Sequence, residues 1–258
     1  MSGNLRLDNR LIVFTIAVGL LGGVLAGLFG VGGGLIMVPL LVGWLRLDQK
    51  TAHATSLAAV VPITIAGTLG FAQTGHVDWQ SAAYLLCGSV LGAFVGARSL
   101  RSFSTKYLYS LFGLLLVASG LRLLWNAEPT QIFSGIFGHA FLLFAGLIAG
   151  VLAGLLGIGG GVVVIPALIC ASGIDSLSAR GTSLAVAVGT SIVGALTHMH
   201  QKNVDNRVAL LMGFAGVPAT FLGVYVSHDL SSNQVTYLFA VLLIGLGVQQ
   251  GRSAMANR

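Results

Sequence analysis

Long apolar runs separated by short polar loops follow one another along the whole chain. About 20 residues of helix cross a bilayer, and most of these runs approach that length with few charged residues. The pattern therefore predicts an all-α polytopic membrane protein. The predicted helical segments are residues 11–29, 33–45, 52–73, 81–98, 106–124, 133–156, 160–173, 180–199, 207–227 and 234–250.

One uncharged stretch is too long for a single crossing. Between Glu128 and Asp175 the chain has 46 residues without Asp, Glu, Lys or Arg. A triple glycine divides this stretch and another divides an earlier one, so we expect a broken helix or a re-entrant hairpin at each, followed by a short arm. The residues expected to form the breaks are Gly32, Gly33, Gly34 and Pro39 in the first stretch and Gly159, Gly160, Gly161 and Pro166 in the second.

Two segments of the chain are nearly identical. Residues 23–34 read GVLAGLFGVGGG and residues 150–161 read GVLAGLLGIGGG, which agree at ten of twelve positions with an offset of 127. The same offset pairs Thr-Ser-Leu at 55–57 with Thr-Ser-Leu at 182–184. One register held over this length indicates internal duplication. We predict transmembrane repeat 1 at residues 11–125, a linker at 126–132 and repeat 2 at 133–251, with four to five helical segments in each.

The composition excludes soluble and disordered proteins. Hydrophobic residues make up 55% of the 258 residues and charged residues 8%, against roughly 25% charged residues in an ordinary soluble domain. A soluble domain so poor in charge would expose apolar patches and aggregate, and disorder requires the opposite composition. The net charge of +6 does not indicate nucleic-acid binding, because the basic residues form no stripe interleaved with aromatic residues.

The basic residues instead indicate the orientation of the chain. If each glycine-broken pair enters the membrane and returns to the same side, one face carries 11 of the 13 Lys and Arg residues and the other carries only Arg122 and Arg180. If each pair is a single crossing, the split is 7 to 6. Basic loops favour the cytoplasm, so the first arrangement is preferred. It makes the second repeat inverted and places both termini in the cytoplasm.

A broken helix inside a membrane is a candidate ion site. The backbone N–H groups at the start of the following arm have no partner within that helix, and together with the helix dipole they attract an anion. Inverted repeats with broken helices are typical of transporters. We therefore expect the two breaks to meet and to bind an anion. The alternative is that the glycines only let helices pack closely.

Carboxylates are absent from the predicted spans. All seven Asp and Glu residues fall in predicted loops, whereas cation and proton carriers usually keep carboxylates inside the membrane. This disfavours a cation transporter. No catalytic residue, cofactor site or metal site is predicted, because the glycine clusters match no nucleotide-binding motif and the histidines lack a convincing further ligand.

Hydroxyl and basic residues follow each short arm. Residues 53–56 read His-Ala-Thr-Ser, and residues 180–183 read Arg-Gly-Thr-Ser. Hydroxyl groups near a helix start bind anions or cap the helix, a guanidinium binds oxyanions with two hydrogen bonds, and a histidine donates to an anion or carries a proton. Plain capping, an interfacial histidine and a headgroup-facing arginine are the alternatives. The candidate binding residues besides the glycines are His53, Thr55, Ser56, Arg180, Thr182 and Ser183.

Further polar residues lie inside the predicted spans. Such residues usually form hydrogen bonds between helices, and the alternative is that they line a transport pathway. The pathway candidates are Thr64, Thr68 and Gln73 in repeat 1 and Thr190, Ser191, Thr197 and His198 in repeat 2.

With these motifs the chain resembles the TauE/SafE sulfite exporter family. The resemblance rests on the two glycine boxes, each followed by a proline and then by HATS or RGTS, and it covers residues 11–251. It implies a bacterial inner-membrane permease for small sulfur-containing anions such as sulfite or an organosulfonate. His53 and Arg180 stand where the family often has a small polar residue, so detailed substrate contacts are not carried over.

The residues and the resemblance together predict a secondary transporter that exports such an anion by alternating access. The membrane potential or a coupled proton would supply the energy. A passive anion channel and a non-transporting membrane scaffold subunit are the alternatives. The oligomeric state, including a homo-oligomer, stays open.

Overall fold

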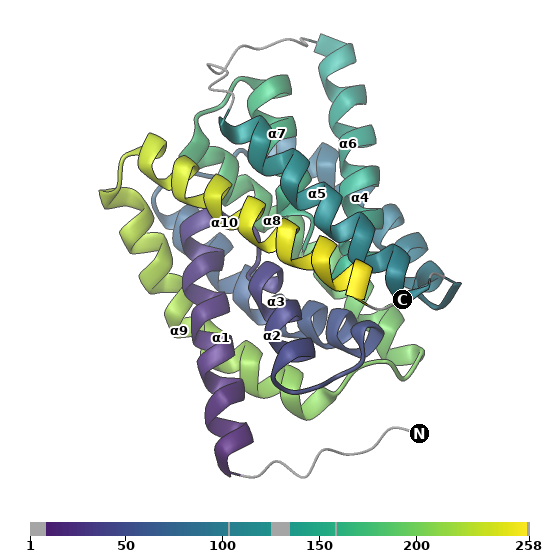
Figure 1. Ribbon diagram of the computed structural model, residues 1–258. Coiled ribbons are helices and arrows are strands. Elements are labelled where there is room, and N and C mark those ends of the chain that lie inside the picture. Colours follow the sequence, from purple (N-terminus) through teal and green to yellow (C-terminus); the bar gives the residue numbers. More distant parts are fainter. Residues whose placement is uncertain (1–8, 103, 125–134, 158, 257–258) are drawn as a thin grey trace.

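The computed structural model describes residues 9–102, 104–124, 135–157 and 159–256. These residues form ten α-helices and one short 3-10 turn, with no strand among them (Figure 1). The helices follow the ten predicted segments in order, so the all-helical prediction is confirmed. Their bounds are α1 (Asn9–Phe29), α2 (Gly34–Gly43), α3 (Gln49–Gln73), α4 (Trp79–Ser99), η1 (Leu100–Ser102), α5 (Thr105–Leu124), α6 (Gly135–Leu156), α7 (Gly161–Ser172), α8 (Ser176–His200), α9 (Asn206–Asp229) and α10 (Ser232–Ala256).

Six of the described helices are long and apolar enough to cross a membrane: α1, α3, α4, α6, α8 and α9. The shortest of them has 21 residues, and a helix of that length extends about 31 Å, which matches the hydrocarbon core of a bilayer. Large apolar side chains such as Leu91, Phe144 and Phe214 are exposed on their outer faces. These faces suit contact with lipid rather than water.

The helices α2 and α7 are too short to cross a membrane alone. They have 10 and 12 residues, which extend about 15 and 18 Å. Pro39 lies inside α2 and Pro166 lies inside α7, so the expectation that these prolines break their helices is wrong. A proline removes one backbone hydrogen bond, and neighbouring helices let a membrane helix tolerate that loss. The interruptions lie at the glycines that precede α2 and α7.

The two halves of the chain contact each other through reciprocal helix pairs. α1 packs along α9 as α6 packs along α4, while α3 packs along α8 and α5 along α10. Gly19 lies against the Met212 backbone, and Gly146 lies against the Leu85 backbone. The offset of 127 relates Gly19 to Gly146 and Leu85 to Met212, so the two contacts are equivalent. Contacts of this kind arise when two similar units are related by a two-fold axis. The repeat boundaries and the inverted orientation stay predictions, and the linker at 126–132 lies outside the described residues.

Glycines bring the backbones of these helix pairs into contact. A Cβ at Gly23 would collide with the carbonyl group of Gly216, and a Cβ at Gly150 would collide with the carbonyl group of Ser89. Lipid chains are as apolar as the helices, so helix association in a membrane depends on close packing of this kind. The glycines therefore hold α1 on α9 and α6 on α4.

Aspartates cap four of the long helices. The side chains of Asp48, Asp78, Asp175 and Asp205 precede α3, α4, α8 and α9, and each accepts hydrogen bonds from two backbone N–H groups of the first turn. The first N–H groups of a helix have no acceptor within it, so these caps satisfy them. These four acids lie between helices, as the sequence predicted.

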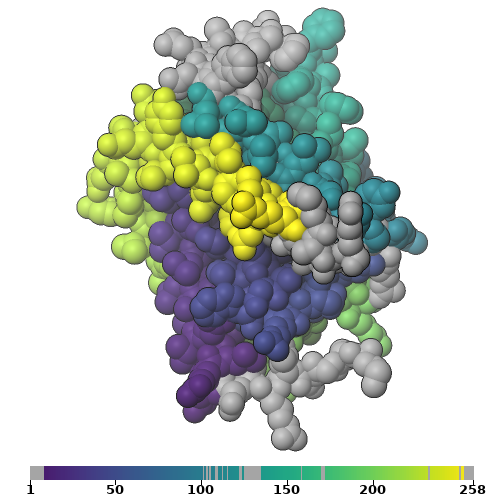
Figure 2. Space-filling view, in the orientation of Figure 1, coloured from purple at the N-terminus to yellow at the C-terminus, as the bar shows by residue number. Residues whose placement is uncertain are grey.

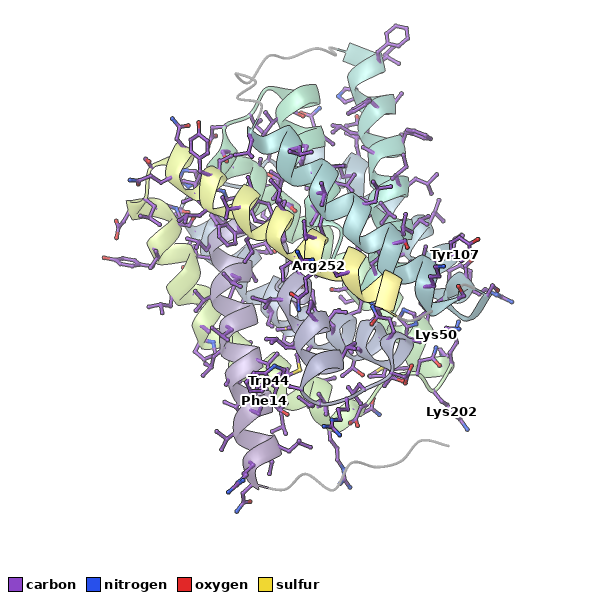
Figure 3. The ribbon with its side chains drawn as sticks, viewed as in Figure 1. Phe14, Trp44, Lys50, Tyr107, Lys202 and Arg252 are labelled. Carbon is purple, nitrogen blue, oxygen red and sulfur yellow. The ribbon has the colours of Figure 1, made fainter. Side chains whose placement is uncertain are left out.

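The helices α5 and α10 form a layer across one face of the molecule. Figure 2 shows α10 crossing the front of the molecule beside α5 and above the α2 region. Phe239 of α10 stacks on Phe29 at the end of α1, with ring centroids 4.8 Å apart. Phe14 of α1 stacks on Trp44, which follows α2, at 4.6 Å (Figure 3). Aromatic contacts therefore fix both the end of α1 and the end of α2.

We predict that Gly150→Ala destabilises the protein. The new methyl group would meet the Ser89 carbonyl, so α4 and α6 would have to move apart, and overpacking of this kind costs about 1–3 kcal/mol. Gly245→Ala in α10 is the matched control, because nothing lies within 4 Å of its Cβ position. Thermal unfolding in detergent measures both variants. Equal Tm values would contradict the close contact of α4 with α6.

Candidate functional site

Glycine makes the two breaks between helices possible. The first break, between α1 and α2, contains Gly30, Gly32 and Gly33, and the second break, between α6 and α7, contains Gly157, Gly159 and Gly160. All six have φ angles between 68° and 80°. This left-handed region brings a Cβ too close to the following carbonyl oxygen, so residues with side chains rarely adopt it. The repeated glycines are therefore a backbone requirement of the breaks.

The two breaks are in direct contact, as the repeat predicted. A Cβ on Gly161, the first residue of α7, would lie 2.7 Å from the Val31 Cα and 2.8 Å from the Gly30 carbonyl oxygen. A Cβ on Gly159 would lie 3.4 Å from the Val31 carbonyl oxygen. The backbone of one break therefore lies against the backbone of the other.

The helices α2 and α7 begin without a side-chain cap. Their N-cap positions are Gly33 and Gly160, which offer no side-chain acceptor to the first N–H groups. The aspartates before α3, α4, α8 and α9 supply such an acceptor. The positive ends of α2 and α7 therefore lack the carboxylate that the other four helices have.

A buried hydroxyl group lies beside these helix starts. Ser183 is 0% exposed, and its Oγ has no hydrogen-bond partner in the part of the chain that the structure describes. A Cβ on Gly161 would lie 2.9 Å from that Oγ. In the other half, Ser56 Oγ donates to the Gly157 carbonyl at 3.1 Å. A buried hydroxyl without a partner costs about 1–3 kcal/mol, so Ser183 is suited to donate to a ligand.

Arg180 is buried beside the first break. Its exposed fraction is 3%, and its Nη2 donates to the Ser176 Oγ at 3.0 Å. A Cβ on Gly30 would lie 2.6 Å from the Arg180 Cα. The headgroup-facing alternative for Arg180 is therefore wrong, because the side chain lies inside the protein. The backbone of Arg180 therefore lies against the first break, while its guanidinium bonds to the first residue of α8.

Asp175 caps the same helix near Arg180. Burial alone would raise the pKa of this carboxyl, but hydrogen bonds from Ser178 and from the Leu177 backbone outweigh burial and hold the pKa below its ordinary value of 3.8. Asp175 is therefore anionic at neutral pH.

His53 occupies the corresponding place beside the second break. It is 0% exposed, and its Nδ1 donates to the Leu156 carbonyl at the end of α6. Its Nε2 lies 2.9 Å from the Nε2 of Gln49. A Cβ on Gly157 would collide with the His53 carbonyl. An interfacial position for His53 is therefore wrong, because the imidazole is enclosed.

Comparison with known proteins places the chain in one family. A family model described as "Sulfite exporter TauE/SafE" matches residues 15–250. The chain belongs to the TauE/SafE family. It is 30% identical to a probable membrane transporter protein of Xylella fastidiosa, over 92% of this chain and 94% of the relative. It is 25% identical to one of Bacillus subtilis over 92% and 96% of the two chains, and 26% identical to one of Methanocaldococcus jannaschii over 92% and 94%.

This TauE/SafE protein is a multi-pass membrane transporter with at least six long apolar helices among its described residues. Membership of a transporter family gives no indication of a catalytic activity. Within the described residues, no group of three or more His, Cys, Asp or Glu side chains could hold a metal ion.

Two threonines of the TauE/SafE protein tie its halves together. Thr182 Oγ1 accepts from the Asp78 backbone N–H at 2.9 Å, and Thr55 Oγ1 accepts from the Asp205 backbone N–H at 3.0 Å. The capping of α3 and α8 comes instead from Asp48 and Asp175. The alternative that these two threonines only cap their helices is therefore wrong. Both hydroxyl groups accept a hydrogen bond from the opposite half.

Most of the polar side chains predicted inside the spans bond to their own helix. Two of them join helices: Thr190 Oγ1 lies 3.0 Å from the Ser89 Oγ, and His198 Nε2 donates to the Gly154 carbonyl at 2.8 Å. Gln73 is exposed at the last residue of α3, so it is not among the buried residues near the breaks. The side chains that donate to a carbonyl three or four residues earlier are Thr64, Thr68, Thr190, Ser191 and Thr197.

Sequence reasoning missed two residues next to the site. Gln49 and Ser176 each bond to the residue four positions later, which is His53 or Arg180. Helical neighbours at this spacing face each other, which is a usable signal once the helix start is known. The predicted segments begin at 52 and 180, whereas α3 begins at 49 and α8 at 176. The polar first turns of both helices lowered the local hydrophobicity and concealed these starts.

We predict that Thr182→Val destabilises the TauE/SafE protein more than Thr197→Val does. The first change leaves the half-buried Asp78 N–H without its acceptor, and the loss of such a hydrogen bond costs about 0.5–1.5 kcal/mol. The second removes only a bond from Thr197 to the carbonyl of its own helix. Thermal unfolding of both variants in detergent is the measurement. If the two Tm values fall equally, the tie between the halves does not stabilise the fold.

Proposed function

We propose that this TauE/SafE protein is a secondary transporter that exports a small sulfur-containing anion, such as sulfite or an organosulfonate, by alternating access. The observation that carries the proposal is the contact between the two breaks, each of which precedes an uncapped helix, beside the unpartnered hydroxyl of Ser183. The family's description supports the sulfur-containing substrate.

The charges around the breaks favour an anion over a cation. Arg180 is buried beside the first break. Among the described residues, each carboxylate lies at or next to a helix end and none is buried. A cation would meet two positive helix ends and a guanidinium without a nearby buried carboxylate. An oxyanion would accept hydrogen bonds from the N–H groups, from Ser183 and from the guanidinium.

The proposed location is the inner membrane of a bacterium, with inverted repeats and both termini in the cytoplasm. The uneven distribution of 11 against 2 basic residues supports this orientation. Lys50 and Lys202 lie in the lower half of Figure 3, toward the end of the molecule where α1 begins. With the cell interior negative, a monoanion that leaves alone gains about 2.3 kcal/mol per 100 mV. A monoanion that leaves together with one proton carries no net charge, and its export would instead follow the concentration gradient of the anion.

Alternating access follows from the two-fold relation of the contacts. The halves meet at the breaks and along the reciprocal helix pairs. Moving one half against the other would open the breaks first to one side and then to the other, while the anion stays between them. A passive channel would keep a continuous pore along the same backbone. Acceleration of uptake by anion on the opposite side supports a carrier, and its absence supports the channel.

We predict that one sulfur-containing anion raises the Tm of the purified protein. The panel contains sulfite, sulfate, thiosulfate, sulfoacetate, taurine, chloride and acetate. A ligand present at 100 times its Kd stabilises the folded state by about 2.7 kcal/mol. Ser183→Ala should reduce this shift, because the donor beside the breaks is lost.

Ser227→Ala is the matched control for that experiment. Ser227 is also buried and has no partner within the described residues, but it lies near the end of α9. This variant should keep the full anion-dependent shift. No shift with any anion in folded wild-type protein would contradict the proposal and favour the scaffold alternative.

We predict that Arg180→Gln weakens anion binding by about tenfold to 150-fold, because a hydrogen bond to a charged group contributes about 1.5–3 kcal/mol. Arg180→Lys should recover only part of the affinity, since an ammonium group cannot form the paired contacts of a guanidinium. Isothermal titration with the anion that shifts the Tm measures all three proteins. Equal affinities would remove Arg180 from the binding site.

A further inference from the structure

The two halves place chemically different residues at one equivalent position. His53 and Arg180 are related by the offset of 127, and the backbone of each lies against the first glycine of the opposite half's break. Each also bonds to a polar residue four positions earlier, Gln49 or Ser176. One position therefore holds a permanent cation, and the other holds a group whose charge depends on a proton.

The residue that corresponds to His53 in the other half is a permanent cation. The backbone of Arg180 packs against Gly30, which directly follows the end of α1. His53 in turn donates to the carbonyl of Leu156, the last residue of α6. The C-terminal end of a helix is the negative end of its dipole and stabilises a nearby cation. The end of α6 would therefore stabilise a protonated His53.

The hydrogen bonds of His53 define its present form. A carbonyl oxygen only accepts, so the Nδ1 that bonds to Leu156 carries a hydrogen. The Nε2 faces the amide nitrogen of Gln49, which only donates, so this Nε2 accepts and the ring is neutral.

The amide of Gln49 can also accept a hydrogen bond from the protonated form of His53. The Oε1 of Gln49 is buried and has no partner within the described residues. Rotation of the amide by half a turn would present this oxygen to an N–H on the Nε2 of His53. The pair can therefore satisfy both the neutral and the charged imidazole.

Charged and titratable groups approach His53 from α8 and from the start of α3. Asp48 is exposed and directly precedes Gln49, and Lys50 follows it. From α8, His198 interacts electrostatically with His53 and is engaged with the Gly154 carbonyl. From α6, the contacts are with the backbone of Leu156 and Gly157. His53 is buried, and Asp48 is the exposed residue nearest to it along the chain, so proton exchange with water would pass Gln49.

We propose that His53 carries the coupled proton of this transporter, so that a proton and the anion move together in the same direction. The proposal rests on the anion-transport function proposed above. A proton from water adds to the lone pair of His53 Nε2, and the amide of Gln49 turns so that its Oε1 accepts the new N–H. The added positive charge strengthens anion binding at the adjacent break. Loss of the same proton on the other side restores the neutral ring and releases the anion.

The test uses the full-length protein in liposomes that contain a trapped pH dye. The membrane potential is held at zero with potassium and valinomycin, and labelled thiosulfate is added outside because its charge does not change over the working pH range. In the wild type, we expect thiosulfate uptake to acidify the interior. Lowering the external pH should raise the initial uptake by at most about tenfold per pH unit, the limit for one proton.

The variant His53→Gln should bind thiosulfate more weakly, seen as a smaller Tm shift, and should no longer acidify the interior. Its uptake should not change with pH. His139→Gln is the matched control: His139 stacks on Tyr84 at 4.3 Å in α6, outside the breaks, and its loss should leave acidification intact. Acidification that persists in His53→Gln at the wild-type ratio to thiosulfate would overturn the proposal.

A second variant covers the case in which His53→Gln fails to fold. Gln49→Leu keeps the histidine and removes the acceptor for its protonated form. We expect the pH of half-maximal uptake to move to a lower value, whereas an unchanged pH profile would overturn the proposal. Loss of acidification in His198→Gln but not in His53→Gln would assign the proton to His198 and also overturn it.

The outcomes separate this inference from the proposed function. Uptake of thiosulfate by the wild type without acidification would overturn proton coupling and leave anion transport standing. Absence of uptake with thiosulfate, sulfate and sulfoacetate, together with absence of any anion-dependent Tm shift, would overturn both.

Discussion

A backbone break inside a membrane is stable only where protein surrounds it, and contact between the two breaks meets this constraint. Lipid offers no hydrogen-bond partner to the N–H and C=O groups that a break sets free. Here Gly161 lies against Gly30 and Val31, so each break shields the other. The glycine faces that bring α1 onto α9 and α6 onto α4 are a condition for this contact, because wider helix spacing would draw the breaks apart. The layer of α5 and α10 covers the same region from one face (Figure 2).

The same constraint explains why the starts of α2 and α7 have no cap. A Cβ at Gly33 would collide with the Gly22 carbonyl, and the φ angle of 77° disfavours any side chain there. At Gly160 the nearest atom is the Ala149 carbonyl oxygen, 3.2 Å from the Cβ position, with a φ of 80°. A capping aspartate therefore fits neither position. The packing that closes the breaks also leaves two positive helix ends without a carboxylate, and the proposed anion binding depends on these two ends.

The sequence predicted the elements well because each helix is a long apolar run and the breaks are repeated glycines. It failed where the decisive partner is distant along the chain. Thr182 and Asp78 are 104 residues apart, so local capping rules could not reveal their bond. Pro39 was misjudged because a proline interrupts one hydrogen bond without ending a helix that its neighbours support. For Arg180 the sequence left two alternatives open, and its burial excludes only the headgroup-facing one.

Identical local sequence does not produce identical chemistry in the two halves. Thr-Ser-Leu occurs at 55–57 and at 182–184, yet Ser56 bonds to a break carbonyl while Ser183 has no partner within the described residues. His53 and Arg180 also occupy equivalent positions in the two halves and differ in their chemistry. Two equal halves would give inward-facing and outward-facing states of equal free energy, and a ligand that binds both states equally shifts neither. Different side chains at equivalent backbone positions of the two halves would make the free energies of the two states unequal. Under the proposed proton coupling, a charge that is permanent in one half and variable in the other would make the balance between the two states depend on the protons and anions that each side of the membrane supplies.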